Sequence, residues 1–143
     1  MLLGEYKHTV DEKGRVAVPA KFRDAFAAGA IITRGLDHSL FIFSMAEWEA
    51  LARKLVALPI AQSNSRAFAR LMLAGAMDVK LDQQGRILIP DYLREYATLG
   101  RQVVLAGLMN RIEVWDAELW AGYKAKTESA SDHIAEQLGE LGI

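Results

Sequence analysis

A chain of 143 residues and 15.8 kDa, with 52% hydrophobic and 24% charged residues, is a globular protein of one or two small domains, not a disordered, collagen-like or coiled-coil chain. The absence of cysteine excludes disulfide frameworks, thiolate zinc sites and thiol catalysis. The net charge of −1 hides a difference between two parts of the chain. Residues 1–111 are mildly basic, with 15 Lys and Arg against 11 Asp and Glu, and residues 112–143 are acidic, with 2 Lys and Arg against 7 Asp and Glu.

The sequence shows no targeting signal and no membrane span. Polar and charged residues occur within Met1–His8, so the apolar core of a secretory signal is missing. The longest nearly apolar runs, Ala25–Ile32 and Val103–Met109, are far shorter than the ~20 residues that cross a bilayer. The sequence therefore predicts a soluble protein of the cytoplasm without a membrane partner.

The first structural signal along the chain is an extended segment, His8–Val10, that leads into a turn of sequence Asp-x-x-Gly-Arg. In such a turn Asp11 can accept hydrogen bonds from nearby backbone N–H groups, and Gly14 can take the positive φ that other residues resist. A strand over Arg15–Val18 follows and ends at a proline, which cannot donate to a ladder. This proline opens a short helix over Ala20–Ala28, because its fixed φ suits a first helical turn.

Residues 29–75 complete this first unit and add a helical insert. Gly29 closes the short helix as a C′ residue, and two further strands are expected on either side of a turn at Leu36–Ser39. Ser44 and Glu47 then have the spacing of a capping box, followed by apolar residues at helical intervals up to a proline. A second helix of the insert is expected over Ser65–Leu73.

Residues 81–94 repeat residues 10–23 at an offset of 71. Asp, Gly, Arg, Pro and a later Arg recur in fixed register, which composition alone would produce in about one alignment in a million. After one extra residue the match resumes at an offset of 72 and extends to a tryptophan. The second copy predicts strands over Met77–Leu81 and Arg86–Ile89, a helix over Asp91–Leu99 closed by Gly100, and a turn at Leu108–Asn110.

Each copy reads as ββαββ, which predicts an α+β, strand-dominated fold with a pseudo-two-fold axis. No flexible linker separates the copies, so we expect one compact body built by both. The expected division is a first copy over residues 1–50, a helical insert over 51–75, a second copy over 76–120 and an acidic helical tail over 121–143.

The repeated arginines are the strongest chemical signal. A β-turn needs Asp and Gly, but it does not need Arg15 and Arg86 at the same place twice. A guanidinium fork suits phosphate oxygens and the O6/N7 edge of guanine. The structural alternative is that each arginine pairs with its own aspartate, Asp11 or Asp82, as a clip. Both roles can hold at once, if the aspartate positions the fork.

The first copy is predicted to be the main nucleic-acid reader. Its turn carries Lys13, whereas the second turn has Gln83 and Gln84, which leaves the second turn less basic. Arg23 and Arg94, in the equivalent short helices, are expected to pair with nearby carboxylates. The residues expected at DNA are Lys7, His8, Lys13, Arg15, Lys21 and Arg86, and those expected to shape the turns are Asp11, Gly14, Asp82 and Gly85.

Catalysis finds no support in the sequence. The three histidines, His8, His38 and His133, are scattered and have no partner at zinc-ligand spacing. Nucleophile-elbow, Walker A and dinucleotide-binding motifs are absent. We therefore expect a protein that is not an enzyme and that needs neither a metal nor a cofactor.

With these residues in place, the sequence resembles the MraZ family of bacterial transcriptional regulators, which carry two SpoVT-AbrB-type domains. The resemblance covers roughly residues 1–124 and combines both copies with the insert between them. The segments that carry it are His8–Arg15, Val18–Arg23, Arg66–Arg70, Asp82–Pro90 and Asn110–Asp116.

The resemblance implies a swapped-hairpin, AbrB-like β-barrel, in which the two copies of one chain take the places of the two subunits of a dimer. It also implies rings of about eight or more subunits, which bind G-rich direct repeats in the promoter of the division and cell-wall gene cluster. The family's Asp-x-x-x-Arg motif falls on Asp11 and Arg15 and again on Asp82 and Arg86.

The hypothesis that follows is a DNA-binding regulator of the nucleoid and cytoplasm, whose partners are double-stranded DNA and further copies of itself. Lys13 would steer and neutralise phosphate, Arg15 would position and read bases, and Arg86 would offer an equivalent surface. The alternative is an antitoxin-like or scaffold oligomer, whose basic turns dock an acidic protein surface without reading DNA.

Overall fold

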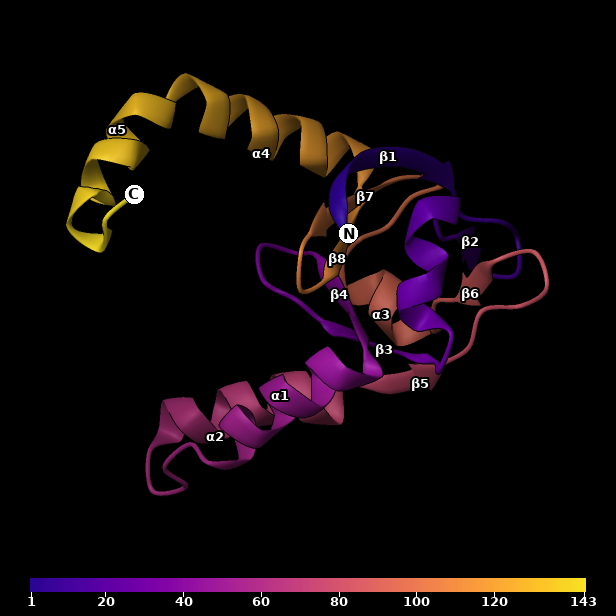
Figure 1. The fold of residues 1–143 in the computed structure, drawn as a ribbon, viewed down its shortest axis with the longest axis horizontal. Helices are drawn as coiled ribbons and strands as arrows, with labels where there is room; N and C mark the ends of the chain where they lie inside the picture. Colours follow the sequence, from indigo (N-terminus) through magenta and orange to yellow (C-terminus); the bar gives the residue numbers. More distant parts are fainter.

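The computed structural model describes all 143 residues, in a mixed α+β fold (Figure 1). The strands are β1 (Leu3–Thr9), β2 (Arg15–Ala17), β3 (Ala30–Arg34), β4 (Leu40–Ser44), β5 (Met77–Val79), β6 (Arg86–Leu88), β7 (Gln102–Leu108) and β8 (Ile112–Asp116). The helices are η1 (Ala20–Phe26), α1 (Met45–Val56), α2 (Ser63–Ala69), η2 (Arg70–Ala74), α3 (Asp91–Tyr96), α4 (Ala117–Ser129), α5 (Ser131–Gln137) and η3 (Gly139–Leu141). The expected α+β class is confirmed, although helical elements equal strands in number, so that strands dominate only the repeated body.

The two copies exchange strands. The six-stranded antiparallel sheet has the order β1-β7-β8-β4-β3-β5, in which the first strand of each copy pairs with the third strand of the other. Equivalent strands also pair with each other, β4 with β8 and β2 with β6. Val16 lies opposite Ile87, its own counterpart in the repeat, so the pseudo-two-fold axis passes between them. Neither copy completes its sheet alone.

These strands do not close into a barrel. The β2–β6 pair is a separate two-stranded sheet, and β1 and β5 are the outer strands of the larger one. The β2–β6 ladder is short because a turn precedes each strand and a proline follows shortly after it, at Pro19 and Pro90. The closed barrel that the resemblance implied is therefore not seen.

One hydrophobic core joins both copies. It is a cluster of 18 buried residues drawn from the sheets and from the inner faces of η1 and α3. Phe22 and Leu93 occupy equivalent positions in these two helices and are 1% and 0% exposed. A smaller cluster of Phe41, Phe43, Leu55 and Met72 fixes the insert to the sheet. The turns after β1 and β5 are thus held by a core that both copies share.

The short helices match their predicted positions but differ in form. Both follow prolines, and the first is a 3₁₀ helix. Gly29 has a φ of +110°, as expected of a C′ residue. In the second copy the positive φ, 53°, falls on Thr98, so the expectation for Gly100 is wrong. In the insert, the Ser44 hydroxyl accepts from the Glu47 backbone N–H at 3.3 Å, which confirms the predicted cap.

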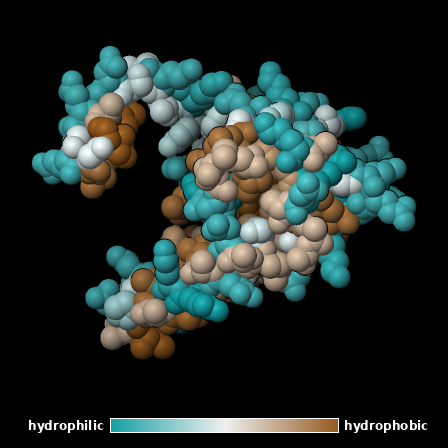
Figure 2. Space-filling model, viewed as in Figure 1, coloured by the Kyte–Doolittle hydropathy of each residue, from teal (hydrophilic) through white to brown (hydrophobic).

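Two helical elements project from the body, the α1–α2 hairpin and the α4–α5 arm (Figure 1). Figure 2 shows apolar surface on both. The exposed apolar side chains of the hairpin are Val56, Leu58, Ile60 and Phe68, and those of the arm and its end are Leu119, Tyr123, Ile134, Leu138, Leu141 and Ile143. None of the helices combines the length and the apolar character that a membrane crossing requires.

Candidate functional site

The two Asp-x-x-Gly-Arg turns have the same geometry. In the first turn one carboxylate oxygen of Asp11 accepts from the backbone N–H groups of Lys13 and Arg15, each at 2.9 Å. Gly14 has a φ of +86° and donates its N–H to the Asp11 carbonyl at 2.9 Å. The second turn repeats these bonds at the same distances with Asp82, Gln84, Gly85 and Arg86. The sequence repeat is therefore a structural repeat at the level of single hydrogen bonds.

Each turn arginine is clipped to its aspartate and still presents a free end. Nε of Arg15 donates to Asp11 at 2.8 Å, and Nε of Arg86 donates to Asp82 at 2.9 Å. Their side chains are 31% and 28% exposed, and no terminal Nη group of either is hydrogen-bonded within the protein. The two roles anticipated for these arginines, clip and ligand-facing fork, are thus geometrically compatible.

The two forks lie on one face of the small sheet. Val16 and Ile87 are fully buried at its centre, so the neighbouring positions of each strand face the opposite side. Arg15 and Arg86 occupy these outward positions, and Nη1 of Arg86 approaches the Asp11 carboxylate to 3.8 Å. The structure therefore brings the two predicted arginines together across the pseudo-two-fold axis.

The aspartates of the turns remain ionised at neutral pH. The pKa of Asp11 is lowered, chiefly by the hydrogen bond from the Arg15 backbone N–H and also by the Arg15 side chain. The pKa of Asp82 is lowered in the same way by Arg86. Because the folded pKa lies below the unfolded one, each ionised aspartate, with its backbone and side-chain partners, stabilises the fold above the ordinary carboxyl pKa of about 3.9, and this contribution is lost as pH falls through the lowered value.

The remaining predicted cations lie on β1, in the first turn and on η1. Lys7, on β1, and Lys13 are exposed. Lys21, on η1, is exposed too, with its ammonium 5.1 Å from the centre of the Tyr6 ring. His8, on β1, is half-buried, and its pKa is lowered by burial and by the nearby charge of Arg23. At pH 7 His8 is therefore a neutral hydrogen-bonding group.

The titration of His8 provides a test of its surroundings. An NMR titration of the imidazole should give a pKa below 6.5, and Arg23→Gln should raise that pKa by removing like charge, without restoring it fully because burial is the larger cause. Since the folded pKa is the lower one, the free energy of unfolding should decrease as pH falls below about 6.5. A pKa that does not respond to Arg23→Gln would contradict this proximity.

Sequence reasoning missed the position of Arg23. Its Nε donates to the Val18 carbonyl at 2.9 Å and it has no carboxylate partner, so the expected ion pair is wrong for Arg23. Arg94 does form the expected pair, with Asp91. Each guanidinium packs against the turn glycine of the other copy, since a Cβ on Gly85 would overlap Arg23 and a Cβ on Gly14 would overlap Arg94. No spacing in the sequence signals these contacts, because they cross between the copies.

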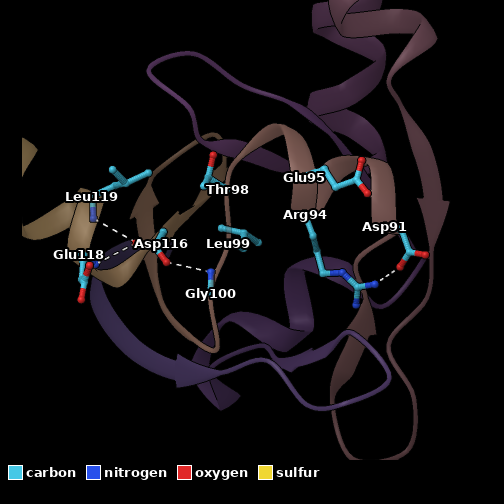
Figure 3. Close-up of a pocket in the computed structure, with 9 residues that line it drawn as sticks. All are labelled: Asp91, Arg94, Glu95, Thr98, Leu99, Gly100, Asp116, Glu118 and Leu119. Carbon is cyan, nitrogen blue, oxygen red and sulfur yellow. Dashed lines mark hydrogen bonds and ion pairs between the residues drawn. The ribbon is translucent and has the colours of Figure 1, made fainter.

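A cavity of about 930 Å³ lies beside Arg94, between α3 and the start of α4 (Figure 3). Its carboxylates outnumber its single cation, so it does not suit a polyanion. Asp116 serves the fold, because its side chain accepts from Gly100 N–H at 2.9 Å and caps α4. No group of three or more His, Cys, Asp or Glu side chains is arranged to hold a metal ion. The charged lining residues are Asp91, Arg94, Glu95, Asp116 and Glu118.

Known proteins are similar to this chain along its whole length. The model of a family described as "MraZ protein, putative antitoxin-like" matches residues 1–71 and again residues 72–140. Transcriptional regulators MraZ are similar over the full length of both chains. Those of Desulfitobacterium hafniense, Halothermothrix orenii and Caldanaerobacter subterraneus are 50%, 48% and 44% identical over 143 residues. The resemblance stated from the sequence is confirmed.

Proposed function

Because the chain belongs to the MraZ family, whose named relatives are transcriptional regulators and not enzymes, we propose that it regulates transcription by binding double-stranded DNA through its two turns. One observation carries this proposal. Arg15 and Arg86 share a face of the β2–β6 sheet, each hydrogen-bonded at Nε and without a hydrogen bond at its terminal nitrogens. This is the arrangement that phosphate oxygens or guanine edges require of an arginine.

The clip gives the fork its orientation before DNA arrives. A side chain that is already fixed through Nε loses less conformational freedom on binding than one that swings freely. Arg15 and Arg86 would reach phosphates or bases, and Lys13 would neutralise phosphate from the tip of the first turn. Asp11, Gly14, Asp82 and Gly85 would shape the turns. The DNA backbone on either side would be contacted by Lys7, Lys21 and the neutral His8.

The target we propose is a set of G-rich direct repeats in the promoter of the division and cell-wall gene cluster, on DNA in the nucleoid. The reader would be a ring of about eight or more subunits, since several weak modules on one assembly can engage repeats in tandem. The exposed apolar side chains of the α1–α2 hairpin and the α4–α5 arm support self-association. The strand exchange between the copies supports a swapped-hairpin arrangement.

Binding of the unmodified protein to defined duplexes tests this function. A duplex with tandem G-rich repeats should bind more tightly than a shuffled duplex of the same composition, and affinity should fall steeply with salt. Sedimentation equilibrium should give several times the protomer mass of 15.8 kDa. Equal, salt-insensitive affinity for both duplexes would favour the antitoxin-like or scaffold alternative, and a monomer would remove the ring.

A further inference from the structure

Each turn is completed by an arginine from the other copy. Arg23, on η1, lies against Gly85 of the second turn, and Arg94, on α3, lies against Gly14 of the first. Both turn glycines have a positive φ, so the backbone passes close beneath the guanidinium with no side chain between them. The charge at each turn therefore depends on a helix that belongs to the opposite copy.

The two arginines differ in their partners. Asp91 directly follows the proline that opens α3, and its carboxylate pairs with Arg94 (Figure 3). The equivalent residue after Pro19 is Ala20, which is exposed and uncharged. Arg23 uses Nε for a backbone carbonyl, and its terminal nitrogens have no partner in the protein. One alanine-to-aspartate difference thus separates a free cation from a neutralised one.

We propose that Arg23 provides a phosphate-binding cation at the second turn and that Asp91 withholds the equivalent cation, Arg94, from the first. The second turn is the less basic one by its own sequence, because it carries Gln83 and Gln84. It thereby gains a positive charge from Arg23 of the other copy. Asp91 sets the relative strength of the two turns on DNA. This inference rests on the proposed function, because it assigns further residues to the same interface.

The physical basis is the free energy of contact with phosphate. A guanidinium without a carboxylate partner can neutralise a phosphate and release its counterion, whereas one already paired must first give up its partner. The logarithm of affinity falls as the logarithm of salt concentration rises. Each phosphate contact makes this slope steeper by about 0.9 on duplex DNA. Two arginines of identical chemistry should therefore differ in both affinity and salt slope.

Matched substitutions test the difference between the arginines. Arg23→Gln should weaken binding of a G-repeat duplex roughly 5- to 20-fold and lower the salt slope by about 1. Arg94→Gln removes the same charge and the same packing, but it should change affinity less than about twofold, because Asp91 already neutralises this cation. Thermal unfolding of both variants shows whether the turns remain folded.

The reciprocal exchange tests the role of the carboxylate. Asp91→Ala should raise affinity and salt slope by freeing Arg94, and Ala20→Asp should lower both by pairing with Arg23. Ala25→Asp, an equal charge change at an exposed position on η1, is the control for long-range repulsion. Three results would overturn the inference even if the unmodified protein binds DNA. They are an equal loss of affinity in Arg23→Gln and Arg94→Gln, no loss of affinity in Arg23→Gln, and no gain of affinity in Asp91→Ala. Failure of the unmodified protein to bind any duplex would instead remove the proposed function.

Discussion

Replacing Arg15 and Arg86 together by alanine should weaken binding of a G-repeat duplex by at least about 30-fold while the protein stays folded. Each bidentate arginine contributes about 1–3 kcal/mol to recognition of its base, and the two forks lie on one face. The turns should survive, because the carboxylates of Asp11 and Asp82 still accept two backbone hydrogen bonds each. Fluorescence anisotropy at two salt concentrations, with circular dichroism of the variant, measures both outcomes.

Two controls separate recognition from general electrostatics. Arg15→Lys keeps the charge but cannot present a planar fork, so it should retain affinity for shuffled DNA and lose preference for the G-repeat duplex. Arg53→Ala removes one positive charge from an exposed position on α1, away from the turns, and should have little effect. A folded double variant with unchanged affinity, or a comparable loss in Arg53→Ala, would place the DNA interface elsewhere.

The sequence was sufficient to predict the turns because every bond in them is local. Asp11 reaches backbone groups two and four residues away, so the Asp-x-x-Gly-Arg pattern contains all the partners it needs. The prolines before η1 and α3 and the cap at Ser44 are local in the same sense, and these elements lie where they were expected. The doubling also predicted that the two turns form the same backbone hydrogen bonds, as they do.

The sequence could not predict contacts that depend on the exchange of strands. The packing of Arg23 against Gly85 and of Arg94 against Gly14 joins residues far apart in the chain, and nothing in either segment specifies the other. The positive φ of Thr98 has a local cause instead, because the Leu99 and Thr98 N–H groups donate to the carbonyls of Arg94 and Glu95 at 3.0 and 3.1 Å and close α3 two residues before Gly100. Long-range pairing therefore decided the contacts of Arg23 and Arg94, and with them the charge at the second turn.

The same exchange predicts that neither copy folds alone. Phe22 is 1% exposed in the shared core, with its ring edge-on to Tyr6 at a centroid distance of 5.4 Å. Phe22→Ala should lower the free energy of unfolding by about 3–5 kcal/mol, through lost burial and the cavity that remains. Because β1 pairs with β7 and β5 with β3, this loss in the first copy should unfold the second copy as well.

Urea unfolding at a fixed protomer concentration measures this coupling. In a Trp48→Phe background, which removes the tryptophan of α1, only Trp115 and Trp120 remain, on β8 and α4, so their fluorescence reports on the half of the molecule that does not carry the substitution. Their transition should coincide with the loss of far-ultraviolet circular dichroism and shift with it to lower urea. Leu93→Ala, at the equivalent position of the second copy, should behave alike, whereas Ile134→Ala on the exposed arm should shift neither signal. A core built by both copies must be lost by both in one transition. Two separate transitions, with the tryptophans unaffected by Phe22→Ala, would therefore show that the copies are independent folding units.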